Sequence, residues 1–148
     1  MTYLDDRVIT ASLVEEANRS DFEDQMDEML GSAGATFIFN CALFLWMTKL
    51  TSGQYKSGYW EYLKLSNGGF YLRLKSDATF SLERDDTGGQ YQASAETVSI
   101  WANLFAFDSV KKVKTMPEQS KKNALKFSHC LREYHTKQNL CLITPMIK

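Results

Sequence analysis

The stretch of sequence that decides the fold is GYWEYLKLSNGGFY, residues 58–71. In this stretch, two runs rich in aromatic and aliphatic residues lie on either side of Asn67-Gly68-Gly69. Asn-Gly is the preferred centre of a two-residue hairpin turn, because both central residues must take positive φ. The sequence therefore predicts a β-hairpin whose turn contains Asn67, Gly68 and Gly69.

The position of the turn sets which side chains share a face of the hairpin. If Asn67 and Gly68 are the two turn residues, one face is mainly apolar and the other carries rings and cations. The expected core face pairs Leu65 with Phe70, Leu63 with Leu72 and Glu61 with Leu74. The opposite face pairs Lys64 with Tyr71, Tyr62 with Arg73 and Trp60 with Lys75. A turn centred on Gly68-Gly69 would shift the register by two and keep both faces.

The face of rings and cations is the candidate binding site. Aromatic rings beside cations on an open sheet can stack bases and hold phosphates. The alternative is that a helix or loop covers this face and that the cation–ring pairs only stabilise the sheet. The expected partner-binding residues are Tyr59, Trp60, Glu61, Tyr62, Lys64, Tyr71, Arg73 and Lys75.

The segments on either side of the hairpin have strand or helix periodicity. Residues 7–14 contain β-branched residues typical of a strand, and residues 15–30 place a narrow apolar stripe on an acidic helix. Residues 35–50 are apolar nearly all round, which predicts a central core helix buried on several sides. Residues 78–84 alternate between apolar and polar and are expected to extend the hairpin into a meander.

The last third of the chain predicts two more helices. Ser94 is a suitable N-cap for a helix with Glu96 in its first turn. Pro117 suits the first position of a helix that ends near Lys137. Residues 140–147 are apolar but contain a proline, so they form either a short edge strand or a packed tail.

Together these segments predict an α+β fold. At 148 residues, 44% of them hydrophobic, the chain has the size of one domain with a substantial core. We expect a single domain, residues 1–148, in which an antiparallel three- to four-stranded sheet with a central hairpin packs against about four helices.

Charge is segregated along the chain, although the net charge is only −1. Residues 1–30 contain nine acidic residues and two arginines, whereas residues 111–148 contain nine lysines and arginines and two glutamates. These segments are expected to be solvated helix faces. The alternative is a pair of electrostatic docking patches.

The cysteines and histidines give little support for metal or nucleophile chemistry. Cys41, Cys130 and Cys141 are an odd number without CxxC spacing, which favours reduced thiols in a cytosol over disulfides. His129 and His135 are six positions apart, so they do not share a helix face. We expect a buried thiol beside surface imidazoles.

Other catalytic motifs are also missing from the sequence. It contains no phosphate-binding loop, no dinucleotide-binding motif and no nucleophile elbow, and Lys64 lies on the wrong face to join Glu61 in a nuclease site. We therefore expect no catalytic residue, no metal and no cofactor, and a protein that is not an enzyme. Residues 33–47 are apolar but fall short of the ~20 residues that span a bilayer, and no signal-peptide pattern precedes them, so a cytoplasmic location is expected.

Residues 58–71 also resemble the signature stretch of the ArdB/KlcA antirestriction family. Further similarities are Trp46-Met47 near the end of the apolar helix, Ser94-Ala95-Glu96 at the start of the next, and Leu131, Arg132 and Tyr134 in the basic helix. The resemblance covers nearly the whole chain, and the hairpin is its most distinctive part. It implies an inhibitor of type I restriction-modification enzymes, carried by plasmids and prophages, which protects incoming mobile DNA.

The resemblance implies a protein partner, the type I restriction enzyme complex, in the bacterial cytoplasm. The sequence itself argues against DNA mimicry, because a mimic needs a dense negative array and this chain has a basic C-terminal third. The alternative function is direct binding of nucleic acid through the hairpin face and the lysine-rich C-terminal helix. The chain departs from the family at residues 36–40, where members often have Glu-Pro, and at Lys148, where many end in an acid.

Overall fold

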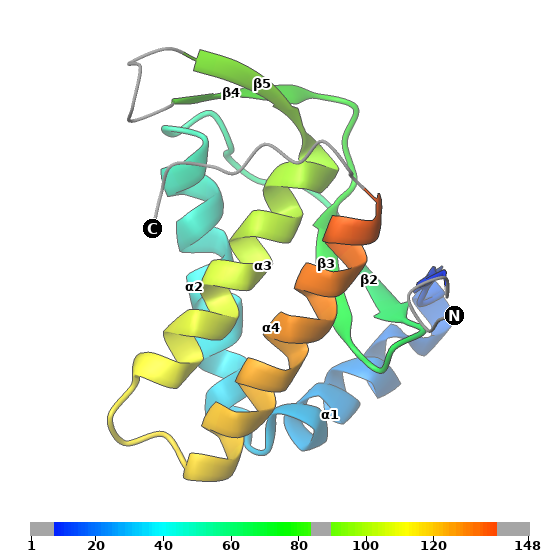
Figure 1. Ribbon diagram of the computed structural model, residues 1–148, viewed down its shortest axis with the longest axis vertical. Coiled ribbons are helices and arrows are strands. Elements are labelled where there is room, and N and C mark those ends of the chain that lie inside the picture. The colour runs from blue at the N-terminus through cyan, green and yellow to red at the C-terminus, as the bar shows by residue number, and fades with distance from the viewer. Residues whose placement is uncertain (1–7, 84–89, 139–148) are drawn as a thin grey trace, which may run out of the picture.

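A computed structural model describes residues 8–83 and 90–138 (Figure 1). The elements in chain order are β1 (Ala11–Leu13), the 3-10 helix η2 (Glu16–Asn18), α1 (Arg19–Leu30), α2 (Ala33–Leu50), β2 (Trp60–Leu65), β3 (Phe70–Leu74), β4 (Thr79–Glu83), β5 (Gln90–Ser94), α3 (Ala95–Lys112) and α4 (Glu118–Gln138). The strands form two antiparallel sheets, with the orders β1-β2-β3 and β4-β5. The predicted α+β class, the central hairpin and the strand near the N-terminus are confirmed.

The hairpin has a three-residue loop instead of the predicted two-residue turn. Gly68 has a φ of 94°, its N–H donates to Leu65 O at 3.0 Å, and the Leu65 N–H donates to Gly69 O at 2.8 Å. A turn followed by a left-handed residue is the usual geometry of a three-residue loop. Lys64 consequently lies opposite Phe70, one position away from the predicted register.

This one-residue shift overturns the predicted faces of the hairpin. Because successive side chains alternate between faces, every residue of β3 now faces the side opposite to the prediction relative to β2. One face carries Trp60, Tyr62, Lys64, Phe70, Leu72 and Leu74. The other carries Glu61, Leu63, Leu65, Tyr71 and Arg73.

Helices cover both faces of the hairpin. The ring of Phe70 lies 5.8 Å from Phe22 of α1 and 6.0 Å from Phe39 of α2, both measured between ring centroids. On the other face, Tyr71 packs against Tyr134 of α4 at 5.8 Å. The hairpin is therefore an internal layer of the molecule, and neither face is an open surface.

Helix α3 covers the outer edge of β3. The Asn103 side chain accepts a hydrogen bond from Leu72 N at 3.0 Å and donates one to Leu72 O at 2.7 Å. The Ser99 hydroxyl accepts from Leu74 N at 3.0 Å. Both polar side chains are fully buried, so this helix satisfies backbone groups that a further strand would otherwise bind.

The predicted meander is wrong. Strand β4 pairs with β5, Phe80 opposite Ala93, and the two form a separate ribbon at the top of Figure 1. The edge of β3 is occupied by α3, so β4 cannot add to the hairpin there. The third strand of the main sheet is β1, which pairs Leu13 with Leu63.

Helix α2 is buried on several sides, as predicted, but it is not buried all round. Its buried residues face α1, α3 and the hairpin, but Phe37 is 65% exposed and Leu45 is 53% exposed. An all-round apolar composition does not reveal which sides of a helix have neighbours. By length and composition α2 could cross a membrane, and 33% of it is buried in the fold.

The two C-terminal helices agree with their predicted limits. The Ser94 hydroxyl accepts a hydrogen bond from Thr97 N at 3.1 Å and caps α3, as predicted. Helix α4 begins directly after Pro117 and packs against α3. The predicted tail at residues 140–147 lies outside the described residues.

Candidate partner-binding site

The structure divides the eight predicted partner-binding residues among different environments. Trp60 and Tyr71 are buried in the core. Three residues are partly buried: Glu61, Tyr62 and Arg73. Three are exposed: Tyr59, Lys64 and Lys75. The predicted ladder of rings and cations on one open face is therefore wrong, because the register and the covering helices separate its members.

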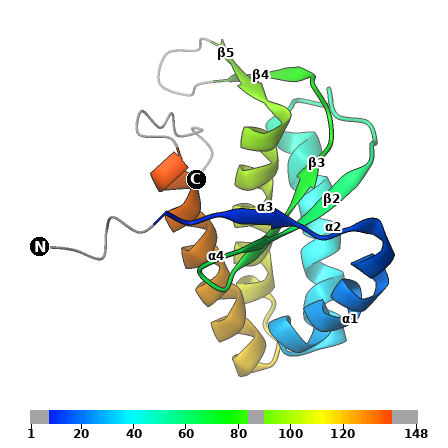
Figure 2. The ribbon, with the colours of Figure 1, turned by 90° about the vertical axis from the view of Figure 1, so that its right-hand side faces the viewer.

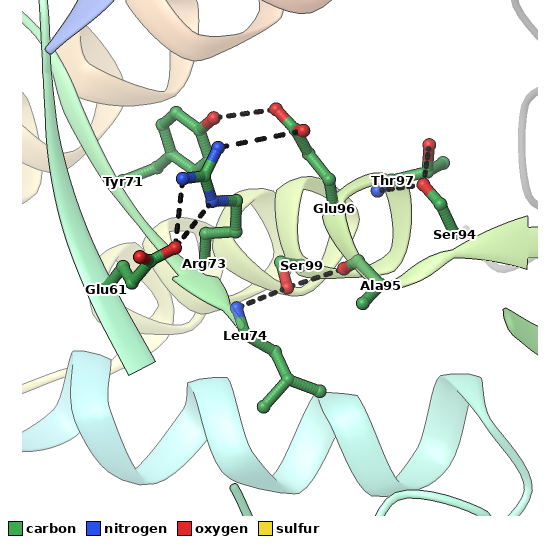
Figure 3. A network of polar contacts seen from close by, with 9 residues as sticks. All are labelled: Glu61, Tyr71, Arg73, Leu74, Ser94, Ala95, Glu96, Thr97 and Ser99. Carbon is green, nitrogen blue, oxygen red and sulfur yellow. Dashed lines mark hydrogen bonds and ion pairs between the residues drawn. The ribbon is translucent and has the colours of Figure 1, made fainter. Parts of the chain in front are cut away.

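Arg73 is the centre of a polar network that joins the hairpin to α3 (Figure 3). Its guanidinium donates through Nη2 and Nε to Glu61 Oε1, at 2.9 and 3.1 Å, and these residues lie opposite each other on β2 and β3. Arg73 Nη1 lies 3.8 Å from Glu96 Oε1. The Tyr71 hydroxyl donates to the other oxygen of Glu96 at 3.0 Å.

The electrostatics of this network favour a structural role. Burial, with Glu96 and Tyr134 nearby, raises the pKa of Tyr71 above its ordinary value, so its hydroxyl stays neutral and acts as a hydrogen-bond donor. Partial burial alone would lower the pKa of Arg73, but Glu61, Tyr71 and Glu96 outweigh it and raise the value. The network holds a charge pair across the hairpin and ties it to the first turn of α3.

Arg19 of α1 organises the exposed end of β2. Its guanidinium lies 4.9 Å from the ring centroid of Tyr59 and 4.6 Å from that of Tyr62. The Tyr62 hydroxyl donates to Glu23 Oε2 at 2.6 Å. The cation–ring contacts predicted from the sequence thus exist here, but the main cation comes from a helix.

The turn of the hairpin is fastened to α4. Asn67 Nδ2 donates to Cys130 O at 2.9 Å, and Asn67 Oδ1 accepts from Gly69 N at 3.2 Å. A Cβ added to Gly69 would lie 2.5 Å from Cys130 Cβ, so this position requires glycine for close approach. Asn67 and Gly69 therefore join the turn to the helix.

One of the two histidines of α4 differs from the prediction that both lie at the surface. His129 is exposed as expected, but His135 is only 2% exposed and packs edge-on against Trp101. Burial lowers the pKa of His135, opposed by Glu96. Cys130 is partly buried, and burial raises the pKa of its thiol. Lys126 opposes this shift, and Glu133 adds a smaller contribution in the same direction as burial. Within residues 8–83 and 90–138, no three His, Cys, Asp or Glu residues are grouped to hold a metal.

Several important residues were not predicted. Asn103 and Ser99 lie among the apolar residues of a core helix, and a polar residue in such a stripe was the available signal for a buried hydrogen bond. Glu96 was recognised as a first-turn acid but not as the partner of Arg73. Arg19 and Glu23 carried no local signal, because only the tertiary structure brings α1 to β2.

A family model described as "Antirestriction protein" matches residues 53–143. This range contains the hairpin, the β4–β5 ribbon, α3 and α4. The chain belongs to the antirestriction protein family. Two relatives, both described as antirestriction protein KlcA from Escherichia coli, are 35% identical to this chain over 102 residues and 34% identical over 103 residues. The alignments cover 68% and 69% of this chain and 68% of each relative.

The fold of this family member is also similar to a solved structure from work on KlcA and ArdB. The TM-score is 0.74 and the sequence identity 26%, over 93% of this chain and 92% of that chain. That work describes a novel fold, and antirestriction activity of KlcA and ArdB against type I DNA restriction systems in vivo but not in vitro.

Proposed function

We propose that this chain relieves DNA restriction by type I restriction enzymes, acting in the bacterial cytoplasm by protein contact and without catalysing a reaction itself. The observation that carries the proposal is the structural similarity to KlcA and ArdB over 93% of the chain. Family membership and the two KlcA relatives support the same function. The buried residues of all four helices and both sheets form one hydrophobic cluster, which supports residues 1–148 acting as one unit.

Charge distribution supports protein contact over DNA mimicry. The segment from η2 through α1 contains six acidic residues and one arginine, whereas α4 contains five lysines and arginines and two glutamates. A mimic of duplex DNA needs negative charge along its length. A surface with separate acidic and basic helices fits a protein surface of mixed charge better.

The structure does not support direct binding of nucleic acid through the hairpin. That hypothesis required rings and cations on one open hairpin face, but Trp60 and Tyr71 are buried and lie on opposite faces. Bases cannot stack on rings that the core encloses. The basic helix α4 alone gives no stacking platform.

The proposal is tested by plating unmodified phage on cells with a type I restriction system, with and without the protein. We expect higher plating efficiency when the protein is present. The controls are the same phage carrying host methylation and a host without restriction, and neither should show an effect of the protein. Unchanged plating on several type I hosts would overturn the proposed function.

Protein contact is tested separately by purifying the tagged chain from the restricting cells. We expect subunits of the type I enzyme to copurify, and the host without a restriction system to supply the background. Relief of restriction without recovery of any subunit, even after chemical crosslinking, would contradict direct contact with the enzyme.

A further inference from the structure

The main sheet ends at β1, which pairs with β2 on its inner side. The Val14 N–H donates to Tyr62 O at 2.8 Å, and the Ser66 N–H donates to Thr10 O at 2.9 Å. Residues 10 and 14 therefore direct their backbone groups toward β2. In an antiparallel pair the alternate residues direct theirs the other way, so Ala11 and Leu13 present N–H and C=O groups to the outer side.

Among the residues that the structure describes, no strand pairs with this outer side of β1. Figure 2 shows β1, in blue, at the front of the molecule with the rest of the sheet behind it. The side chain of Leu13 is 51% exposed. The edge thus combines available backbone hydrogen-bonding groups with an accessible apolar side chain, which are the features that a bound strand uses.

A hollow of about 490 Å³ lies beside this edge. Leu13, Val14 and Phe22 supply apolar lining, from β1 and α1. Glu15 and Asp21 line the same hollow, and both are exposed. An extended chain on β1 would direct every second side chain toward one face of the sheet, so the hollow is placed to receive such a side chain.

Charge indicates which side chains the hollow would accept. In the described part of the chain, neither Glu15 nor Asp21 has an ion-pair partner. Lys64 is the cation in the lining, against the two carboxylates of Glu15 and Asp21. The carboxylates disfavour a phosphate backbone and favour lysine or arginine.

We propose that the β1 edge and this hollow form a docking groove for an extended, basic segment of a partner protein. Backbone groups of the segment bond to Ala11 and Leu13, and its lysine or arginine side chains reach Glu15 and Asp21. The inference deepens the proposed function, on which it rests for the identity of the partner as part of the restriction machinery. The groove itself is defined by the sheet edge and the hollow, and it can be tested alone.

The first test measures binding of a fluorescent peptide of alternating valine and lysine to the purified chain. A peptide of alternating valine and glutamate is the charge control. The groove variant carries Glu15→Gln and Asp21→Asn, which keep the side-chain shapes. The matched variant carries Asp24→Asn and Glu28→Gln, which remove the same charge from exposed positions of α1 outside the hollow.

We expect the valine-lysine peptide to bind the native chain and the matched variant with affinities within about twofold, and the groove variant at least about tenfold more weakly, the change that 1.4 kcal/mol produces. Amide resonances of Ala11 and Leu13 should shift on titration, and circular dichroism should show all variants folded. Absence of binding, or equal weakening by both variants, would overturn the groove. If the groove variant sediments differently from the native chain, a second copy occupies the edge in the native chain, and this result also overturns the proposal.

The second test plates unmodified phage on restricting cells that carry each variant. If the native chain and the matched variant relieve restriction and the groove variant does not, the groove is the docking site. If the groove variant relieves restriction as well as the native chain, the inference is wrong and the proposed function stands. If the native chain itself fails, the proposed function is wrong, and the peptide measurement still decides whether the groove exists.

Discussion

The two edges of the three-stranded sheet have opposite environments. At β3, Asn103 and Ser99 of α3 bind the backbone of Leu72 and Leu74, and all four residues are buried. At β1, the outward backbone groups have no strand beside them in the described ranges, and Leu13 is half exposed. An exposed edge invites pairing with another chain. The difference separates an edge that stabilises the fold from an edge that is available for binding.

This contrast predicts different consequences for substitutions at the two edges. Removing a buried partner of a backbone group leaves that group unsatisfied in the core, which lowers the free energy of unfolding. Changing an exposed edge residue removes few contacts and affects binding more than stability.

The largest effect is expected for Asn103→Leu. The substitution keeps the approximate shape but leaves both the N–H and C=O of Leu72 without their partner, so the free energy of unfolding should fall by about 2–4 kcal/mol. Urea unfolding followed by circular dichroism measures the change. Asn123→Leu, at a partly exposed position of α4, is the control and should cost less than about 1 kcal/mol. Equal losses would show that the edge contact contributes little.

A smaller effect is expected for Ser99→Ala. It removes the acceptor of Leu74 N, a single buried group, and should cost about 1–2 kcal/mol. Ser109 on the same helix donates to Phe105 O, within its own helix, so Ser109→Ala is a matched control and should change stability by less than about 0.5 kcal/mol. Urea midpoints of the two variants make the comparison. A larger loss of stability for Ser109→Ala than for Ser99→Ala would contradict a stabilising role of Ser99 at the edge of β3.

Acid should weaken the contact between α3 and α4 that keeps α3 on the closed edge. The pKa of His135 is lowered in the folded chain from 6.5, so the unfolded chain takes up this proton first as pH falls. The contribution of His135 to stability is therefore complete above about pH 6.5 and is lost progressively below it. Urea midpoints should fall between about pH 7.5 and about pH 5.5, and less so in His135→Gln. His129→Gln, at an exposed position, should keep the pH dependence of the native chain. If both variants altered the pH dependence of the urea midpoint equally, His135 would not be its source.

The smallest effect on stability is expected at the open edge. Leu13→Lys should change the free energy of unfolding by less than about 0.5 kcal/mol, because the side chain is half exposed. Leu63, its partner across the strands, is 3% exposed, so Leu63→Lys should be severely destabilising. Urea unfolding compares the pair. A loss above about 1.5 kcal/mol for Leu13→Lys would mean that the β1 edge is packed and not open.

The hairpin shows how far local sequence could predict the structure. Its existence and position followed from Asn67-Gly68 between two apolar runs, and the Ser94 cap followed from its side chain alone. The register did not follow, because two- and three-residue loops use the same residues and differ only in how the strands close. A difference of one residue then exchanged the faces and dispersed the predicted binding site.

The sequence by itself determined the class of elements, the limits of the long helices, the segregation of charge and the family resemblance, because these depend on local periodicity and composition. Only the tertiary structure decided that α3 closes one edge of the sheet, that Arg19 of α1 meets Tyr59 and Tyr62, and that β4 pairs away from the hairpin. The first two contacts join segments distant in the chain, and the third depends on which edge of the sheet is already occupied. Which segments meet is set by competition among all buried surfaces at once. Short-range patterns carry no information about that competition.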